Sequence, residues 1–204
     1  SNAGINEGDK LSVKDCLYAL LLKSANESAN ALAEHVAGST EAFADMMNAK
    51  AKELGCTDTH FANPSGLNNP EHYTSTYDMA LIARAAFLNP TFEEIDSTTY
   101  YKLPPNSINP EGLTIYPGHK MLKKSTPYYY PGIVGGKTGY TTLAGNTLVT
   151  CAKKNGLKLI AVILKGSTPQ YWTDTKNLLD FGFQNFVSVC AADHETKYSP
   201  VSSD

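Results

Sequence analysis

The sequence has no long uncharged apolar segment. Its longest apolar stretches, residues 17–22 and 159–164, are far shorter than the roughly 20 residues that a membrane-spanning helix needs. We therefore expect these stretches to be core elements of a globular protein.

Metal and disulfide signatures are also missing. No Cys-x-x-Cys pair occurs among the four cysteines, and the five histidines form no His-Glu-x-x-His. Such spacings are what identify zinc sites and redox motifs. We expect no metal ion, no cofactor and no disulfide framework. The cysteines are Cys16, Cys56, Cys151 and Cys190.

The chain has too few basic residues for a polyanion-binding surface. Its 17 Lys and Arg residues are outnumbered by 20 Asp and Glu residues, which gives a net charge of −3 at pH 7. Nucleic-acid binding needs a concentrated positive surface, so we expect no nucleic-acid partner. What is present is a hydrophobic share of 42% over 204 residues, enough for one substantial core.

Three regions differ in character along the chain. Residues 1–3, Ser-Asn-Ala, resemble the scar of a cleaved expression tag and are left out of the fold prediction. Residues 4–188 form the predicted domain, and residues 189–204 form a polar tail. A signal peptide would then have preceded Gly4, so the sequence carries no information on targeting.

The first half of the domain is predicted to be helical. Ser12 and Asp15 form a capping-box pattern that opens a helix over 13–23, and Gly38 ends a second helix over 27–37. A third helix begins after residue 39 or 40 and stops at Gly55. A fourth follows the cap signal at Ser75 and is ended by the Asn-Pro pair at 89–90.

The second half changes to strand patterns. Residues 98–103 are β-prone, and further strands are predicted over 133–140, 145–152 and 157–164. Asn155-Gly156 between the last two is a strong hairpin signal. A closing helix is predicted over 171–185. Helices followed by an antiparallel hairpin and a last helix indicate an α+β fold, with a helical cluster packed on an antiparallel sheet.

Two short motifs could carry chemistry. Ser24-Ala25-Asn26 lies where the first two predicted helices meet, and Lys137-Thr138-Gly139 lies on a predicted strand after two glycines. Each has an ordinary structural interpretation: Ser24 and Asn26 as helix caps, and Lys137 as an exposed strand lysine beside bulge glycines. A second Ser-x-Asn copy at residues 28–30 shows how easily the first motif arises by chance.

The order and context of these motifs resemble the penicillin-binding protein and serine β-lactamase superfamily, and most closely its D-alanyl-D-alanine carboxypeptidases. Four segments carry the resemblance, which covers roughly residues 4–186. They are Leu-Leu-Leu-Lys-Ser-Ala-Asn-Glu-Ser-Ala at 20–29, Thr-His-Phe-Ala-Asn-Pro-Ser-Gly-Leu at 59–67, Ser-Thr-Tyr-Asp-Met-Ala at 75–80 and Gly-Lys-Thr-Gly-Tyr-Thr at 136–141. The resemblance implies a β-lactamase/transpeptidase-like fold.

The resemblance also implies roles for three catalytic residues. In this family a serine attacks the bond between two D-alanines and forms an acyl-enzyme that water hydrolyses. Ser24 would relay a proton to the leaving amine, and Asn26 would bind the substrate's peptide carbonyl. Lys137 would hold the terminal carboxylate and tune proton transfer.

Three neighbouring residues are implied to bind substrate. Thr138 would share the carboxylate with Lys137, and Gly139 would let the substrate backbone lie along the strand edge. Tyr140 would give a backbone N–H to the oxyanion hole.

The sequence departs from the family pattern at its most important member. No Ser-x-x-Lys occurs anywhere in the 204 residues: Ser12 is followed by Asp15 at the third position, and Ser24 by Glu27. We expect the N-terminal part of the domain, with the nucleophile, to lie upstream and this chain to be inactive. Loss of that part would expose core surface, so we also expect self-association.

The predicted function is therefore that of an extracytoplasmic serine D-Ala-D-Ala carboxypeptidase, acting on peptidoglycan stem peptides, acylated by β-lactams and in its parent form associated with the membrane. Two alternatives stay open. One is a non-catalytic peptidoglycan-binding or regulatory module of the same fold. The other, a β-lactamase, matches the segment at 59–67 less well.

Overall fold

A three-stranded antiparallel sheet organises the C-terminal half. The computed structural model describes residues 1–189. The sheet has the order β3-β4-β5, with β3 at Ile133–Thr141, β4 at Gly145–Lys154 and β5 at Leu157–Gly166. Asn155 and Gly156, both at positive φ (50° and 79°), make the two-residue turn between β4 and β5. The hairpin prediction is confirmed, because this turn needs two residues that tolerate positive φ.

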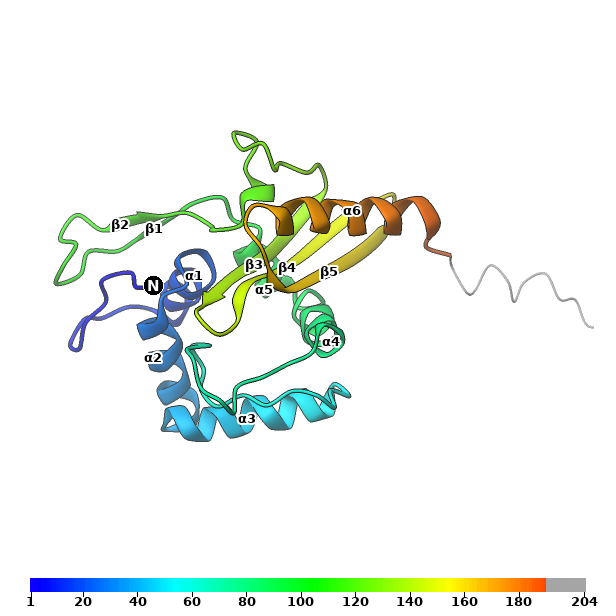
Figure 1. The fold of residues 1–204 in the computed structure, drawn as a ribbon. Helices are drawn as coiled ribbons and strands as arrows, with labels where there is room; N and C mark the ends of the chain where they lie inside the picture. Colours follow the sequence, from blue (N-terminus) through cyan, green and yellow to red (C-terminus); the bar gives the residue numbers. More distant parts are fainter. Residues whose placement is uncertain (190–204) are drawn as a thin grey trace, which may run out of the picture.

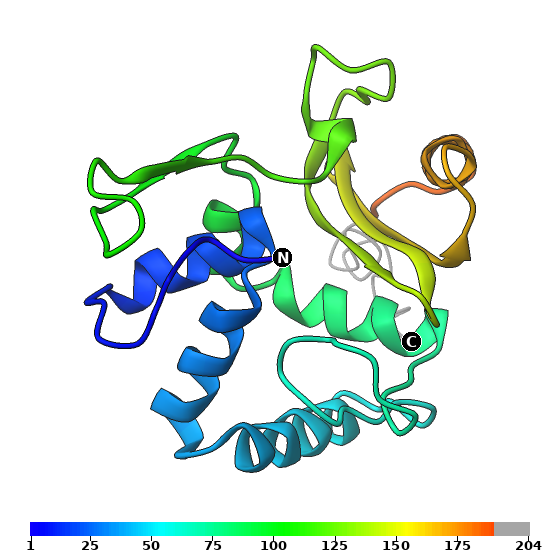
Figure 2. The same cartoon turned by 60° about the vertical axis from the view of Figure 1, so that its left-hand side comes forward.

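Helices cover both faces of this sheet. The helix α6 (Gln170–Asn185) lies along one face, whereas α4 (Thr76–Ala86) and α5 (Pro90–Asp96) pack on the other (Figure 1). The helices α1 (Val13–Lys23), α2 (Asn26–Ala37) and α3 (Thr40–Glu53) follow one another beyond them, and the segment 54–75 runs between α3 and α4 (Figure 2). The predicted α+β fold, a helical cluster on an antiparallel sheet, is confirmed.

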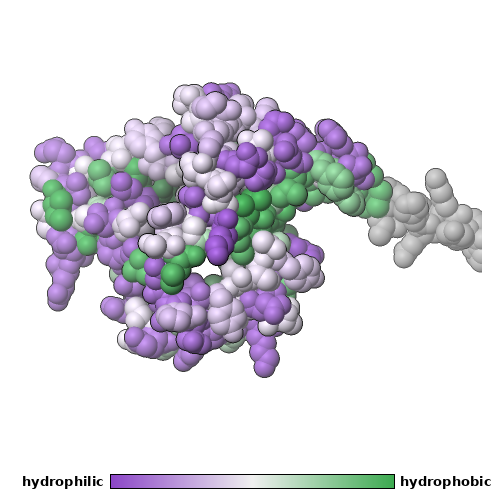
Figure 3. Space-filling view, viewed as in Figure 1, coloured by the Kyte–Doolittle hydropathy of each residue, from purple (hydrophilic) through white to green (hydrophobic). Residues whose placement is uncertain are grey.

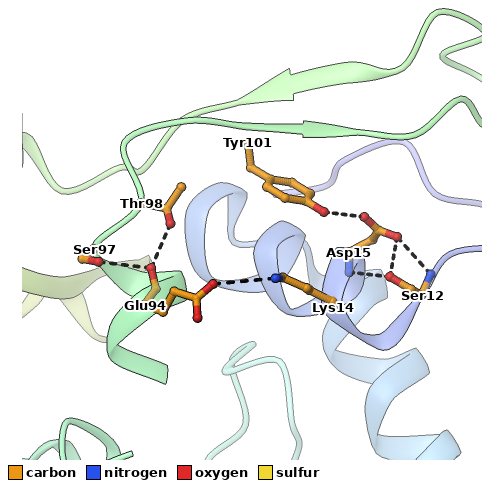
Figure 4. Close-up of polar contacts among 7 residues, drawn as sticks. All are labelled: Ser12, Lys14, Asp15, Glu94, Ser97, Thr98 and Tyr101. Carbon is orange, nitrogen blue, oxygen red and sulfur yellow. Dashed lines mark hydrogen bonds and ion pairs between the residues drawn. The ribbon is translucent and has the colours of Figure 1, made fainter. Parts of the chain in front are cut away.

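A local signal places the start of α1 where the sequence predicts it, whereas α4 ends at Ala86, before the Asn-Pro pair predicted to end it. Ser12 caps α1 through its side chain, which accepts from the Asp15 N–H at 3.1 Å, and Asp15 accepts in return from the Ser12 N–H. The same carboxylate accepts a hydrogen bond of 2.8 Å from the Tyr101 hydroxyl, which ties the strand β1 (Tyr101–Leu103) to α1 (Figure 4). Tyr101 also stacks on Tyr18, with ring centroids 3.7 Å apart.

Three short elements were not predicted from the sequence. The Asn-Pro pair at 89–90 opens α5, with Asn89 as its N-cap and Pro90 as its first residue. The strand β2 (Leu113–Ile115) pairs with β1 in a separate two-stranded ribbon, and the 3₁₀ helix η1 is formed by Lys120–Leu122. Segments of three to seven residues are too short to show a hydrophobic period, so pattern analysis misses them.

The core has two parts. One buries α1 against α5 and the β1-β2 ribbon, around Tyr18, Ile95 and Leu103. The other buries α6 against β4 and β5, around Leu148, Trp172 and Leu179. Ala3, from the segment interpreted as a tag scar, packs into the first part.

The edge of the sheet formed by β5 is open and apolar. Within residues 1–189, β5 pairs with β4 and with no other strand. Figure 3 shows apolar residues gathered along β5 and under α6. An open apolar edge strand is a template for further strand pairing.

Three further predictions concern membrane-spanning helices, the cysteines and the C-terminal tail. None of the helices in the described part of the chain is long and apolar enough to cross a membrane. The cysteines at 16, 56 and 151 are free thiols. Cys190 and the predicted tail from residue 190 onward lie outside the described residues.

Candidate functional site

The first motif forms a sharp turn between α1 and α2. Ser24 is the C-cap of α1 in the left-handed conformation (φ 58°, ψ 41°), and its backbone N–H donates to Leu20 O. Ala25 is the N-cap of α2, and Asn26 is the first residue of that helix. This two-residue link leaves the Ser24 and Asn26 side chains half-buried at the helix junction. The capping interpretation therefore holds for the position of Ser24, at the C-cap of α1, but not for Asn26, which lies inside α2.

The second motif meets the first. Lys137 lies on β3, and its ammonium donates hydrogen bonds to the Ser24 hydroxyl and, at 2.9 Å, to Thr138 O. The first of these contacts joins residues 113 positions apart in the sequence. Lys137 is half-buried, so it is not the exposed strand lysine of the alternative interpretation. Burial lowers the pKa of Lys137, and the Asp96 charge opposes that effect.

The second Ser-x-Asn copy is not part of this site. Ser28 is fully buried within α2, and its hydroxyl has no hydrogen-bond partner among the described residues. Asn30 is exposed. The two copies, which the sequence could not distinguish, are separated by the helix start at Asn26.

The remaining predicted residues lie along β3. A Cβ at Gly139 would lie 2.4 Å from the Thr147 hydroxyl on β4, so a side chain at this position would displace Thr147. Thr138 is half-buried, and a Cβ at Gly118 would lie 2.9 Å from its hydroxyl. Tyr140 is 70% exposed. Because β3 pairs only with β4 among the described residues, its other edge is free to accept an extended peptide.

Two buried titratable groups enclose the glycine pair before Lys137. On one face, a Cβ at Gly135 would lie 2.5 Å from Asp96 Oδ2. On the other, a Cβ at Gly136 would lie 2.7 Å from His119 Cδ2 and 2.2 Å from Val149 O. A side chain at either position would displace a neighbour. The register of β3 against β4 does shift between Ile133 and Gly135, as the bulge interpretation expects, and close packing is a second reason for glycine at these two positions.

Burial shifts these two groups in opposite senses. It raises the pKa of Asp96 to about 7, although the neighbouring Gly136 N–H and the Lys137 charge lower it. It lowers the pKa of His119 to about 4, and the Lys137 charge acts in the same direction. His119 Nε2 is bonded to the Thr150 hydroxyl at 2.8 Å.

No sequence pattern pointed to either Asp96 or His119. Asp96 ends a helix that was not predicted, and His119 was one histidine among five without a motif. Their position around Gly135 and Gly136 depends on packing between α5, η1 and β3.

Known proteins match most of this chain. The family described as D-alanyl-D-alanine carboxypeptidase (peptidase S11) matches residues 1–168. D-alanyl-D-alanine carboxypeptidase DacF of Bacillus subtilis is 34% identical over 89% of this chain and 45% of its own length. DacB2 of Mycobacterium tuberculosis is 36% identical over 88% of this chain and 61% of its own.

Solved structures show the same similarity to enzymes of this kind. The Streptomyces K15 DD-transpeptidase superposes with a TM-score of 0.82 at 30% identity, covering 90% of this chain and 72% of that protein. The chain belongs to the D-alanyl-D-alanine carboxypeptidase family. It spans about half the length of the curated relatives that it matches.

Proposed function

We propose that the whole protein is a serine D-Ala-D-Ala carboxypeptidase that removes the terminal D-alanine from peptidoglycan stem peptides. The observation that carries this proposal is the contact between Lys137 and Ser24, which joins the two family motifs into one half-buried site. Membership of the family supports it. The protein would act outside the cytoplasm, where peptidoglycan lies, and the parent would be associated with the membrane.

The site residues divide the chemistry among them. Lys137 attracts the terminal carboxylate of the substrate, with Thr138 as a second donor. Asn26 holds the peptide carbonyl that precedes the scissile bond. Along the free edge of β3 the substrate backbone adds as a strand, and the Tyr140 N–H donates to the developing oxyanion.

The reaction has two steps. A serine hydroxyl gives its proton to the lysine amine of its own motif, and its oxygen attacks the carbonyl of the penultimate D-alanine. The C–N bond breaks, and the proton passes through the Ser24 hydroxyl to the leaving amine. Water then hydrolyses the ester and restores the serine. The attacking serine belongs to Ser-x-x-Lys, which the 204 residues do not contain. We propose that this motif is supplied by sequence outside them.

A fluorescent penicillin tests this assignment. Because β-lactams acylate the same serine, the whole protein should give a labelled band on a denaturing gel, and the 204-residue chain should give none at any concentration. Ser24→Ala serves as the control variant. A band from the 204-residue chain that disappears in Ser24→Ala would identify Ser24 as the nucleophile and contradict the proposal.

The second candidate is a non-catalytic peptidoglycan-binding module. It is favoured by one observation, the absence of Ser-x-x-Lys from the 204 residues. It predicts that the whole protein binds peptides ending in D-Ala-D-Ala without releasing D-alanine and takes no penicillin label.

We also propose that the 204-residue chain self-associates, with a second copy pairing along β5. The open apolar edge supports this. Sedimentation should show a dimer that Leu164→Lys, on the edge strand, dissociates. Val36→Lys replaces an exposed apolar residue on α2 and should leave the dimer intact. A monomer with a cooperative melt above the usual range of about 45–65 °C would contradict this proposal.

A further inference from the structure

A buried carboxylate lies beside Lys137 under strand β3. Asp96 ends α5 and is 3% exposed. A Cβ at Gly135 would lie 2.5 Å from its Oδ2 and 3.2 Å from its Cγ. The register with β4 is unbroken from Gly135 onward, so Gly135 and Lys137 face the same side of the sheet. The carboxylate therefore takes the place of a side chain at position 135, next to that of Lys137.

The fold gains little from this carboxylate. Asp96 Oδ2 is buried and has no hydrogen-bond partner among the described residues. A buried carboxylate with an unsatisfied oxygen costs free energy, and its burial already raises the pKa of Asp96 to about 7. A buried group of this kind beside a candidate site points to function rather than stability.

The acceptors that contact the Lys137 ammonium carry no charge. They are the Ser24 hydroxyl, from the α1 junction, and the carbonyl of Thr138. On the opposite face of β3, burial lowers the pKa of His119 to about 4, so that ring is neutral at pH 7. None of these groups compensates the positive charge of Lys137.

The other titratable groups near Asp96 are neutral or already paired. Burial raises the pKa of the Cys151 thiol, on β4, to about 12. Glu93, also on α5, forms an ion pair with Lys158 at 2.6 Å. Among the described groups, Asp96 is the carboxylate near Lys137 that forms no ion pair within 4 Å.

We propose that Asp96 is a positioning residue that keeps Lys137 in its charged ammonium form, acting on it across the bare backbone of Gly135. Burial alone favours the neutral amine of a lysine, which would not attract a carboxylate. Glycine at 135 lets the Asp96 carboxylate come close enough to oppose that effect. The inference rests on the proposed role of Lys137 in holding the terminal carboxylate of the substrate.

The first test measures Lys137 itself, without any reaction. In the 204-residue chain with isotope-labelled lysines, the Lys137 signal is assigned by its loss in Lys137→Ala and followed by NMR against pH. Lys137 should titrate at lower pH in Asp96→Asn than in the unaltered chain. Should Asp96→Asn not fold, Asp96→Ser is smaller, also neutral, and carries the same test.

Asp78→Asn is the matched control. Asp78 is as buried as Asp96 but lies on α4, where the Thr59 hydroxyl and the Asp58 N–H donate to it at 2.7 Å. Lys137 should titrate in Asp78→Asn as in the unaltered chain. An unchanged titration in Asp96→Asn, or an equal shift in Asp78→Asn, would overturn the inference.

The second test uses the whole protein and peptides with a free terminal carboxylate. Near pH 6 the unaltered Asp96 is largely protonated, so Asp96→Asn should have nearly the same kcat/KM. At alkaline pH, where Lys137 loses its proton, kcat/KM of the variant should drop below that of the unaltered protein. The drop should be about tenfold for each unit by which the substitution lowers the pKa of Lys137. A purely structural role gives one loss at every pH and an unchanged Lys137 titration, and these two results together would overturn the inference.

The two tests separate two failures. One combination of results separates them: the Lys137 titration shifts in Asp96→Asn, but the difference in kcat/KM between variant and unaltered protein is the same at every pH, for free-acid and for amidated peptides. The proposed contact of Lys137 with the substrate carboxylate is then wrong. The electrostatic link from Asp96 to Lys137 then stands.

Discussion

Replacing Lys137 with Ala should lower kcat/KM of the whole protein for peptides with a free terminal carboxylate by about 10- to 150-fold. A hydrogen bond to a charged group contributes roughly 1.5–3 kcal/mol, and each 1.4 kcal/mol corresponds to about tenfold in rate. The loss should be much smaller for peptides whose terminal carboxylate is amidated, because the partner charge is then already absent. Steady-state kinetics with both peptides and both proteins form a double-mutant cycle.

Lys153→Ala is the matched control for this experiment. Lys153 is an exposed lysine on the neighbouring strand β4, and its replacement should leave both peptides unaffected. If the losses from Lys137→Ala and from amidation simply add, Lys137 and the carboxylate do not interact. The role given to Lys137 would then be wrong.

Asp96 and His119 should make opposite contributions to the pH dependence of the free energy of unfolding, so replacing one should expose the contribution of the other. Between about pH 4.5 and 6.5, the free energy of unfolding of Asp96→Asn should rise relative to the unaltered chain by about 1.4 kcal/mol per pH unit, or about 3 kcal/mol in all. Relative to the same reference, that of His119→Gln should fall by a similar amount.

The signs follow from proton binding in the two states. The folded pKa of Asp96 is raised to about 7 from 3.8, so in this window the folded state holds a proton that the unfolded state has lost, and stability falls as pH rises. The folded pKa of His119 is lowered to about 4 from 6.5, so the unfolded state holds the extra proton and stability rises with pH. In the unaltered chain the two effects oppose each other.

Urea unfolding of the three proteins across this range measures the effect. Hydrogen bonds from Thr59 and from Lys176 lower the pKa of Asp78 and of Asp180, so these carboxyls titrate below the window. Burial lowers the pKa of His72, which adds a rising slope to all three proteins alike and cancels in the differences. Parallel curves for the three proteins would show that neither group titrates as described.

The sequence by itself determined the elements whose signals are local. The capping box of Ser12 and Asp15 fixed the start of α1, and Asn155-Gly156 fixed the β4-β5 hairpin, because each depends on residues a few positions apart. The four segments at 20–29, 59–67, 75–80 and 136–141 were together sufficient to predict the family.

Only the tertiary structure showed which Ser-x-Asn triplet contacts Lys137 and which segment pairs with β1. Ser24 and Ser28 both begin a Ser-x-Asn triplet. In the folded chain Ser24 lies at the end of α1 and contacts Lys137 from β3, whereas Ser28 is buried within α2. The ribbon of β1 and β2 has three residues in each strand, so its pairing depends on contacts with α1 and not on its own pattern.

The surroundings of Lys137 also depend on tertiary packing. Asp96 from α5 and His119 before η1 meet β3 through packing between segments that are distant in the sequence, at Gly135 and Gly136. Their pKa values are set chiefly by the loss of water around them, and water is excluded only once these segments have packed together. The sequence could therefore name the lysine of the site, while the folded chain decided what surrounds its charge.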